Sequence, residues 1–504
     1  MMLFAGSGGL YCSSQYVFTR RLYSRIFLWE GDRRAMSKDF GSLILAAGQG
    51  TRMKSELLKV LHPIMGIPMV SLVVDAVKEA GITKPAVVIG HQGDKVRQTL
   101  KEQVRYVHQE EQRGTGHAVM VASEWLEQLQ DVLVLYGDTP LVTPGLLNRL
   151  MKRHRESSAA ATLLTAEVDD PEGLGRVVRD EQGEMVSIVE EADASHAESA
   201  INEINTAIAC FKVEPLLEML PLLEPDNEQG EYYLPDVFEL QLKKEYNVQT
   251  VKAADAQEVI GVNTRRGLAE ATEIFRARII DEVMARGVTV TDPATTWISP
   301  HACIEQDTVI LPFTTLEGHC KIGKGCRIGP MAHLANSNTG CETQVWYSMV
   351  EDSQLGDGVV VGPFAHLRPG NIIADEVKIG NFAELKNSEV GRGSKIPHHS
   401  YVGDASLGDD INMGAGAITV NYDGRKKHQT TIKNGAFVGC NSNLIAPLRI
   451  GERGFVAAGS TVSEDVPPES LAIERAQHEN REGWVRRRFP IEEIDDDSKT
   501  PCEE

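Results

Sequence analysis

The sequence predicts two different folds in one chain, an α/β domain followed by a parallel β-helix. Short apolar strands alternate with helical stretches from residue 41 to about residue 264. From residue 298 onward, an aliphatic residue recurs every six positions. One amphipathic stretch, residues 265–287, separates these two patterns and predicts a single connecting helix. We therefore expect domains at residues 41–264 and 288–487, joined by that helix.

The period of six is the strongest of these signals. A helix repeats near 3.6 residues and a plain strand alternates at two, so this spacing fits only a strand that bends regularly. Each bend returns a large apolar side chain to the same wall. Further runs follow in new phases at residues 355–385, 390–402 and 432–462. An ordinary sandwich with accidental spacing is the alternative, and seven consecutive hits disfavour it. The first run is Ile298, Ile304, Ile310, Leu316, Ile322, Ile328 and Leu334.

Charge and composition exclude several classes of function. The 504 residues include 51 Lys and Arg against 72 Asp and Glu, a net charge of −21. Such a chain is unsuited to non-specific binding of nucleic acid or of anionic membranes. No uninterrupted apolar run reaches 18 residues, so no transmembrane helix is expected. The eight cysteines show no CxxC spacing, which favours thiols in a reducing cytoplasm.

The two ends of the chain differ in composition from the rest. Residues 1–40 combine arginines with aromatic and small residues, and Met36 stands directly before the first domain. This favours a translated extension or a wrongly chosen start, with a targeting peptide as the alternative. The tail, residues 488–504, is acidic and is expected to be disordered.

Three apolar stretches define the sheet of the first domain. Residues 42–45, 86–89 and 131–135 are expected to be strands, with helical stretches between them. Alternation of this kind predicts a mostly parallel, doubly wound sheet. Ligands of such sheets bind beyond the carboxyl ends of the strands.

A glycine-rich turn follows the first of these strands. The segment LAAGQGTRM runs from Leu45 to Met53, and Lys59 follows six residues later. Glycines let the backbone approach a phosphate, and the following amide groups face its charge. Arg52 and Lys59 would neutralise a triphosphate and the leaving pyrophosphate. A purely structural turn would explain the glycines but not the cations beside them.

A carboxylate at the end of the third strand is the second candidate. Tyr136, Gly137 and Asp138 close that strand, where a carboxylate can hold Mg²⁺ against phosphate oxygens. A lone aspartate at a strand end is more often a cap. Together with the glycine-rich turn, it is a far more specific signal.

Two stretches of the hexapeptide domain suggest chemistry. Residues 420–428 loop out of the pattern and carry an arginine, two lysines and a histidine, which suggests anion binding, although a solvated loop is the alternative. In the coil before it, His398 and His399 stand side by side, and a neutral imidazole can accept a proton from an attacking amine. Spacing alone does not choose between these two histidines.

These motifs, in this order, resemble a known family. The first domain resembles the sugar nucleotidyltransferases, through LAAGQGTRM, the segment QEEQRGTGHA at 109–118, EINT at 203–206 and GEYY at 230–233. With the hexapeptide domain attached, residues 41–487 resemble the bacterial bifunctional uridylyltransferases and acetyltransferases that make UDP-N-acetylglucosamine. The implied fold is a Rossmann-like nucleotidyltransferase domain, a connecting helix and a left-handed parallel β-helix of hexapeptide repeats.

The resemblance implies roles in uridylyl transfer from UTP to N-acetylglucosamine-1-phosphate. Mg²⁺ would be held by Asp138 and Asn263. The structural alternatives are a turn at Gly175 and a strand-end cap at Asn205. The residues implied to hold nucleotide and sugar are Leu45, Ala46, Ala47, Gly48, Arg52, Lys59, Gln109, Gly114, Thr115, Tyr136, Gly137, Asp138, Gly175, Glu190, Asn205 and Asn263.

It also implies acetyl transfer from acetyl-CoA to glucosamine-1-phosphate. The family motif GSK-x-x-H places the base at His398. Position 440 departs from the family, which as a rule has serine there, so the polar contact of Cys440 is in doubt. The sugar phosphate would meet Arg368, Lys386, Tyr401 and Asn412, and acetyl-CoA would meet Ala415, Asn421, Tyr422, Cys440, Ala458 and Arg475.

The resemblance further implies a cytoplasmic homotrimer whose product feeds peptidoglycan, lipopolysaccharide and lipid A synthesis. Two other interpretations compete with it. A nucleotidyltransferase whose hexapeptide domain only assembles or regulates it would need no base and no basic loop. A non-catalytic scaffold would leave LAAGQGTRM, the Tyr136–Asp138 segment and GEYY unexplained.

Overall fold

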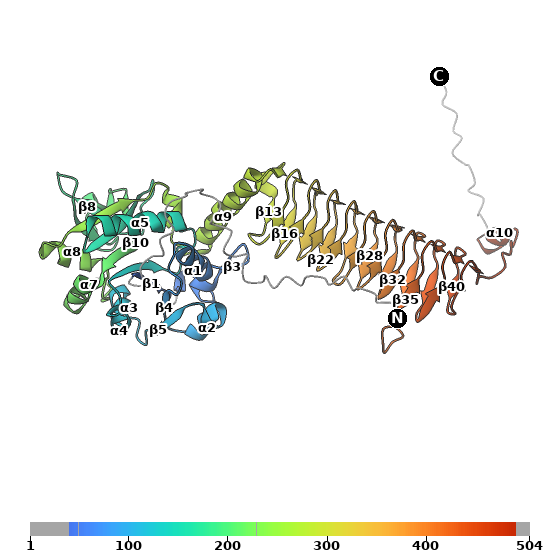
Figure 1. The fold of residues 1–504 in the computed structure, drawn as a ribbon, viewed down its shortest axis with the longest axis horizontal. Coiled ribbons are helices and arrows are strands. Elements are labelled where there is room, and N and C mark those ends of the chain that lie inside the picture. Colours follow the sequence, from blue (N-terminus) through green and yellow to red (C-terminus); the bar gives the residue numbers. More distant parts are fainter. Residues whose placement is uncertain (1–39, 49, 228, 490–504) are drawn as a thin grey trace, which may run out of the picture. The chain divides into compact units, whose positions relative to one another are not determined.

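The computed structural model describes residues 40–48, 50–227 and 229–489, which fall into two compact units divided after residue 341 (Figure 1). The predictions for residues 1–39 and for the tail beyond 489 lie outside the described residues. Phe40, which was assigned to the extension, belongs instead to the first strand and is buried. No helix among the described residues is long and apolar enough to cross a membrane.

The first unit is organised around a nine-stranded sheet in the order β11-β7-β10-β6-β1-β4-β5, with β8 and β9 branching from β10. The predicted strands are confirmed as β1 (Phe40–Leu45), β4 (Ala86–Ile89) and β6 (Asp131–Tyr136), and β1 pairs in parallel with both others. Because β10 runs antiparallel to β6 and β7, the sheet is mixed. The other strands are β5 (Arg105–His108), β7 (Ala161–Glu167), β8 (Arg176–Arg179), β9 (Met185–Val189), β10 (Glu203–Lys212) and β11 (Val248–Lys252).

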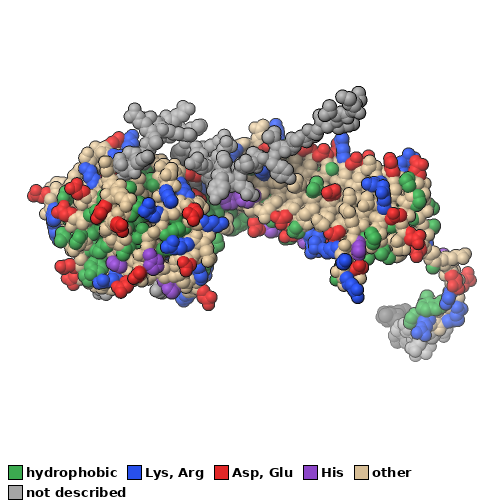
Figure 2. Space-filling view, turned by 60° about the horizontal axis from the view of Figure 1, so that its bottom comes forward, with side chains coloured by type: hydrophobic (Ala, Val, Ile, Leu, Met, Phe, Trp, Pro, Cys, Tyr) green, Lys and Arg blue, Asp and Glu red, His purple; other side chains and the backbone are tan. Residues whose placement is uncertain are grey.

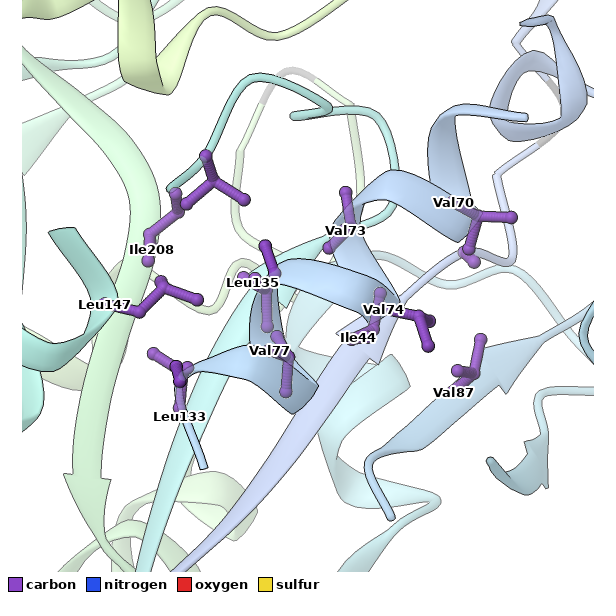
Figure 3. Close-up of a cluster of buried hydrophobic side chains, with 14 of the residues drawn as sticks. Ile44, Val70, Val73, Val74, Val77, Val87, Leu133, Leu135, Leu147 and Ile208 are labelled. Atoms are coloured by element: carbon purple, nitrogen blue, oxygen red, sulfur yellow. The ribbon is translucent and has the colours of Figure 1, made fainter. Parts of the chain in front are cut away.

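Helix α1 (Met69–Glu79) shows how the sheet is covered. Val70, Val73, Val74 and Val77 recur at helical spacing and are buried on the strand residues Ile44, Val87, Leu133 and Leu135 (Figure 3). Each such side chain stabilises the domain by about 1.5–3 kcal/mol. The other described helices before the connector are α2 (Gly93–Leu100), α3 (Thr115–Met120), α4 (Ser123–Leu126), α5 (Pro144–Ser157), α6 (His196–Ser199), α7 (Val213–Met219) and α8 (Asp236–Lys243).

The predicted connecting helix is α9 (Arg265–Ala285). Thr264 caps its start, since its hydroxyl accepts from the Gly267 amide at 3.1 Å. Phe275, Ile279 and Val283 lie on its buried face. The chain leaves the helix at Gly287, whose φ of 89° suits a residue without a side chain.

The six-residue period is confirmed as stacked parallel strands of a β-helix. From β12 (Thr289–Val290) onward, short strands pair with the strand one coil later, as Val361 does with Ile379. The periodic aliphatic residues are buried in the coil interior, with exposures of 0–7%. Shorter coils explain the changes of phase: Leu385 pairs with Val402, one residue closer than the usual eighteen. The loop at 420–428 lengthens a later coil, where Met413 pairs with Val438.

The strands that matter below lie on two faces of the second unit. One face carries β25 (His366–Leu367), β28 (Glu384–Lys386), β31 (Tyr401–Gly403) and β34 (Ile418–Val420). The next face carries β27 (Lys378–Asn381), β30 (Lys395–His398), β33 (Asn412–Met413), β36 (Phe437–Val438) and β39 (Phe455–Val456).

Candidate functional site

Hydrogen bonds to its backbone anchor the glycine-rich turn that follows β1. The Ala46 amide donates to the Val88 carbonyl at 2.9 Å, and the Gln112 side chain donates to the Ala47 carbonyl. Gly50 has a φ of 67°, and a Cβ there would lie 2.5 Å from the Cβ of Lys59. Glycine at this position therefore lets the lysine stem pack directly against the turn.

Four of the predicted side chains converge beside this turn. The Lys59 ammonium pairs with the Asp138 carboxylate and donates to Asn263 Oδ1 at 3.0 Å, and Arg52 donates to the same oxygen at 3.3 Å. The Val262 amide donates to the Asp138 carbonyl at 2.8 Å and so fixes the approach of Asn263. Two oxygen ligands from distant segments thus face one cation, which is the kind of donor set that suits Mg²⁺.

The QEEQRGTGHA segment at 109–118 and the GEYY segment at 230–233 pack against each other. Gln109 is buried and donates to the Gly114 carbonyl at 3.3 Å. Gly114 has a φ of 103°, and a Cβ there would lie 2.6 Å from the Tyr232 carbonyl oxygen. The Leu234 amide donates to the Thr115 hydroxyl at 3.0 Å. The two segments therefore constrain each other's sequence through packing, in addition to any constraint that a ligand imposes.

The three residues implied to hold the sugar also lie together. The Asn205 amide donates to the Gly175 carbonyl at 2.8 Å, and a Cβ on Gly175 would approach Glu190 Oε1 to 3.0 Å. Burial raises the pKa of Glu190, as does the Asp236 carboxylate, while Arg176 opposes the shift.

Tyr136 lies between the nucleotide and sugar sides of this site. Burial raises the pKa of its phenol well above the usual range, against a hydrogen bond with Thr115, and the charges of Glu190 and Asp138 raise it further. It is therefore a neutral phenol beside the two carboxylates. Gly137 follows it, where a Cβ would press on the Cβ of Ala46 at 3.3 Å.

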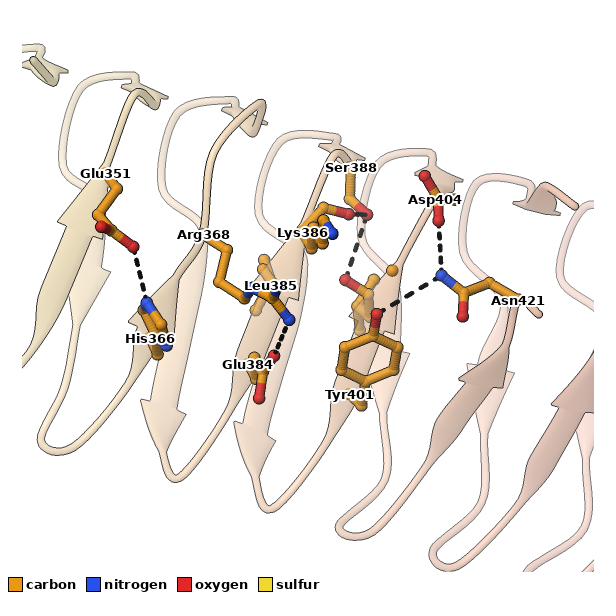
Figure 4. Close-up of polar contacts among 12 residues, drawn as sticks. Glu351, His366, Arg368, Glu384, Leu385, Lys386, Ser388, Tyr401, Asp404 and Asn421 are labelled. Atoms are coloured by element: carbon orange, nitrogen blue, oxygen red, sulfur yellow. Dashed lines mark hydrogen bonds and ion pairs between the residues drawn. The ribbon is translucent and has the colours of Figure 1, made fainter. Parts of the chain in front are cut away.

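In the second unit, three of the four predicted phosphate ligands, Arg368, Lys386 and Tyr401, lie on successive coils of one face (Figure 4). The fourth, Asn412, lies on the next face, in β33. Arg368 pairs with Glu384 at 2.9 Å. A hydrogen bond and the charge of Lys427 lower the pKa of the half-buried Lys386, and Arg368 adds to this effect. Since these cations repel one another, their cluster favours an anion between them. Tyr401 lies one coil beyond Glu384 in the same row.

Asn421 closes this face and is oriented by a carboxylate. Its amide donates to Asp404 at 2.6 Å and lies 3.5 Å from the Tyr401 hydroxyl (Figure 4). Lys427 lies 3.6 Å from the same carboxylate. Asp404 therefore connects the coil to the loop.

The loop at 420–428 folds back as a small hairpin, with a bridge between Tyr422 and Lys427. Asp423 accepts from the Arg425 and Lys426 amides at 2.7 Å, and these hydrogen bonds, with one from His428, lower its pKa to about 2. Lys and Arg side chains gather on a protruding loop of this unit in the space-filling view (Figure 2), and the cations of this segment and Tyr422 are exposed.

A column of residues along one corner of the coils starts at His398 and carries four of the residues predicted to bind acetyl-CoA. The amide that follows each position donates to the position one coil earlier: Gly416 to His398 at 3.2 Å, Asn441 to Ala415 at 2.8 Å, and Gly459 to Cys440 at 2.8 Å. The Arg475 guanidinium donates to the Ala458 carbonyl at 3.1 Å. His398, Ala415, Cys440, Ala458 and Arg475 therefore follow one another along the stack, and Asn412 lies in β33, one coil after β30.

His398 is held by a side chain that the sequence analysis did not identify. Its Nδ1 hydrogen-bonds to Asn381 Oδ1 on the coil before, and their backbones are in register. Because a carbonyl oxygen only accepts, Nδ1 donates this hydrogen bond, and in the neutral imidazole that leaves Nε2 as the nitrogen able to accept a proton. His399, its neighbour, instead stacks on Phe382 with ring centroids 4.9 Å apart. The structure thus distinguishes the two histidines.

Asn381, Glu384 and Asp404 are the polar partners that sequence reasoning missed. Each lies one coil, 17 residues, before a predicted site residue: His398, Tyr401 and Asn421, respectively. Coil spacing was the signal that would have found them. In the first unit, Val262 and Tyr232 were missed because they act through backbone groups.

Comparisons with known proteins find matches in both the α/β domain and the hexapeptide domain. Residues 42–204 match the MobA-like NTP transferase domain family, and residues 301–336 match the bacterial transferase hexapeptide family. The chain is 48% identical to the bifunctional protein GlmU of Shouchella clausii over 447 residues, which cover 88% of this chain and 98% of that protein. It is 49% identical to the GlmU protein of Geobacillus thermodenitrificans over 88% of this chain and 97% of the relative. For the GlmU protein of Halalkalibacterium halodurans the identity is 48%, over 90% of this chain and 100% of the relative.

Proposed function

The chain belongs to the family of bifunctional GlmU proteins, and from this premise we propose how each of its two sites works. The protein is a glucosamine-1-phosphate N-acetyltransferase and a UDP-N-acetylglucosamine diphosphorylase. The two activities run in sequence, because the acetylated sugar phosphate accepts the uridylyl group. The assignment of individual residues below is our proposal.

The first unit carries uridylyl transfer. A phosphate oxygen of N-acetylglucosamine-1-phosphate attacks the α-phosphorus of UTP, and the bond to pyrophosphate breaks. The turn from Leu45 to Gly48, with Gln109, Gly114 and Thr115, holds the uridine nucleotide. Gly175, Glu190 and Asn205 hold the sugar. Lys59 and Arg52 neutralise the phosphates, so that positioning and charge supply the rate.

Asp138 and Asn263 are the proposed ligands of Mg²⁺, which when bound would neutralise charge on the phosphate oxygens. The support is their convergence on the single ammonium of Lys59. Tyr136 and Gly137 shape the wall beside them.

The second unit carries acetyl transfer. The amine of glucosamine-1-phosphate attacks the thioester carbonyl of acetyl-CoA, so a C–N bond forms and the C–S bond breaks. Nε2 of His398 accepts the amine proton, and the thiolate of coenzyme A leaves. Arg368, Lys386, Tyr401 and Asn412 hold the sugar phosphate.

Acetyl-CoA would extend along the corner column that starts at His398. Ala415, the next position, lies beside the thioester, and Cys440, Ala458 and Arg475 follow. Asn421 and Tyr422 reach it from the loop. The observation that carries this assignment is the unbroken column from the proposed base through these positions.

We further propose that the protein is a cytoplasmic homotrimer assembled through its β-helix. Tyr347, Phe364 and Phe382 stack in a row and are 38%, 54% and 52% exposed. An apolar row of this kind is typical of a surface that associates with another copy. A reducing cytoplasm suits the exposed thiols of Cys341 and Cys440.

We propose domains at residues 40–264, 265–287 and 288–487, with an extension before them and an acidic tail at 488–504; the first domain begins at Phe40 because that residue lies in β1. A chain starting at Met36 should keep its melting temperature and both activities. Residues 288–487 alone should sediment as a trimer and keep acetyl transfer, whereas an active monomer would refute the assembly.

The direct test of function is a coupled assay. Purified protein is incubated with glucosamine-1-phosphate, acetyl-CoA, UTP and Mg²⁺, and UDP-N-acetylglucosamine is measured. Omission of acetyl-CoA should abolish the product unless N-acetylglucosamine-1-phosphate is supplied. Product formed from glucosamine-1-phosphate without acetyl-CoA would contradict the assigned order.

A further inference from the structure

The start of α9 touches the proposed nucleotide site at several points. The segment 262–265 runs past Asp138 and Lys59 before the helix begins. Its first helical residue, Arg265, donates from Nε to the Met53 carbonyl at 3.3 Å. Met53 ends the short helix η2 (Thr51–Met53), which also contains Arg52. The connecting helix is thus tied to the turn that follows β1.

The second contact of Arg265 is with a buried histidine. Its Nη1 lies 3.2 Å from Nδ1 of His62, which is 3% exposed and follows η3 (Lys59–Leu61). A guanidinium can only donate, so His62 Nδ1 must accept and the imidazole must be neutral. Burial lowers the pKa of His62, and the charge of Arg265 lowers it further. Arg265 therefore joins both short helices that carry the phosphate-binding cations.

A second arginine of α9 reaches the loop on the other side of the site. Arg278 donates to the Leu141 carbonyl at 2.7 Å, three residues beyond Asp138. Asn263 completes the frame, since its side-chain oxygen accepts from both Arg52 and Lys59. The helix thus contacts the loops after β1 and after β6, which contribute the cations and the carboxylate.

We propose that Arg265 is a positioning residue for uridylyl transfer, which sets Arg52 against the leaving pyrophosphate by holding the end of η2. This rests on the proposed function of the first unit. It makes α9 a working part of the nucleotide site as well as a connector. Arg265 itself need not touch any substrate.

The test compares Arg265→Ala with the matched control Arg266→Ala in the full chain. Arg266 is the next residue, and among the described residues its exposed side chain pairs with Glu270. Arg265→Ala should lower kcat for uridylyl transfer about tenfold, the effect of one charge-assisted hydrogen bond, with little change in KM for N-acetylglucosamine-1-phosphate. Arg266→Ala should match the parent. Acetyl transfer by the same samples shows that the second unit is active, and an unchanged melting temperature shows that the first unit is folded.

Two further variants separate positioning from a merely structural role. Arg265→Lys keeps one of the two donors and should recover part of the lost kcat. If Arg265 acts through Arg52, the double variant Arg52→Ala/Arg265→Ala should be within about twofold of Arg52→Ala alone. Full multiplication of the two losses would overturn the proposal.

The outcomes also separate this proposal from the function on which it rests. An inactive parent would contradict the uridylyltransferase assignment itself. An active parent with an equally active Arg265→Ala variant would overturn only the role of Arg265. If Arg265→Ala unfolds the first unit, Arg265→Lys decides: a reduced kcat at an unchanged melting temperature supports the proposal, and a parental kcat overturns it.

Discussion

The two sites of this protein are assembled in opposite ways. In the α/β unit, Lys59 and Asn263 meet although 204 positions separate them along the chain. In the β-helix, Asn381 and His398 meet because they lie one coil, 17 positions, apart. The first site needs the whole domain to fold before any of it exists. The second site is built from neighbouring coils, so the positions of its residues follow from their spacing along the chain.

The two sites also differ in what shifts the pKa values of their charged groups. Burial raises the pKa of Asp236 in the α/β unit to about 6 and raises that of Glu190, so this unit holds carboxylates away from water. In the β-helix, the pKa of Lys386 is lowered chiefly by the neighbouring Lys427. The first site therefore depends on desolvation, and the second on the crowding of like charges that an anion relieves.

Among the tests of this comparison, removal of Lys59, the cation at the centre of the α/β site, should have the largest effect on activity. Lys59→Ala takes away the group on which Asp138 and Asn263 converge, so uridylyl transfer should fall about 10²–10³-fold. Acetyl transfer should not change. Lys54→Ala is the control, since Lys54 is exposed nearby. A similar loss in both variants would show that general charge, and not the position of Lys59, matters.

Asn381 provides the matching test in the β-helix, with a smaller effect. Asn381→Ala should lower kcat for acetyl transfer about tenfold, because the imidazole of His398 loses the acceptor that fixes its tautomer. Asn381→Asp keeps an acceptor and should retain most activity. If Asn381→Ala kept the parental kcat, the contact would not position the imidazole.

Sequence reasoning succeeded where a physical rule repeats. The buried positions of the β-helix followed from one period, and β1, β4 and β6 followed from apolar runs. It failed for β10, whose antiparallel insertion between β6 and β7 leaves no local signal. Arg52, Lys59 and Asp138 were predicted from the glycine-rich turn and the strand end, whereas Asn263 came from resemblance, because no local pattern reveals that it approaches Asp138. Asn381 was predictable from coil spacing alone.

The effect of burying a carboxylate in the α/β unit can be tested at a residue outside the proposed site. Asp75, in α1, has its pKa raised to about 6 by burial, against the charge of Lys78. A raised carboxyl pKa means that stability is present at low pH and is lost as the pH rises through 6. Asp75→Asn should therefore raise the free energy of unfolding at pH 8 by on the order of 1–3 kcal/mol, and much less at pH 4. Denaturant unfolding at both pH values measures this, and an equal effect at both would refute it.

The smallest expected effect concerns Cys440, where relatives as a rule have serine. Its thiol is exposed on the corner column, so a thiol reagent should block acetyl transfer, acetyl-CoA should protect, and uridylyl transfer should continue. Cys440→Ser should keep acetyl transfer within about threefold of the parent, because the hydroxyl is smaller but a better donor, and it should resist the reagent. Cys341→Ser is the matched control for the other exposed thiol in the described chain. A Cys440→Ser variant as sensitive as the parent would remove Cys440 from the cofactor site.

The most direct test of the central claim, that two independent sites lie in one chain, is to measure both activities on two variants. Asp138→Asn should abolish uridylyl transfer and leave acetyl transfer at the parental rate. His398→Ala should lower acetyl transfer by about 10²–10⁴-fold and leave uridylyl transfer intact. If either substitution removed both activities from a protein that is still folded, the two sites would not be independent and the account would be wrong.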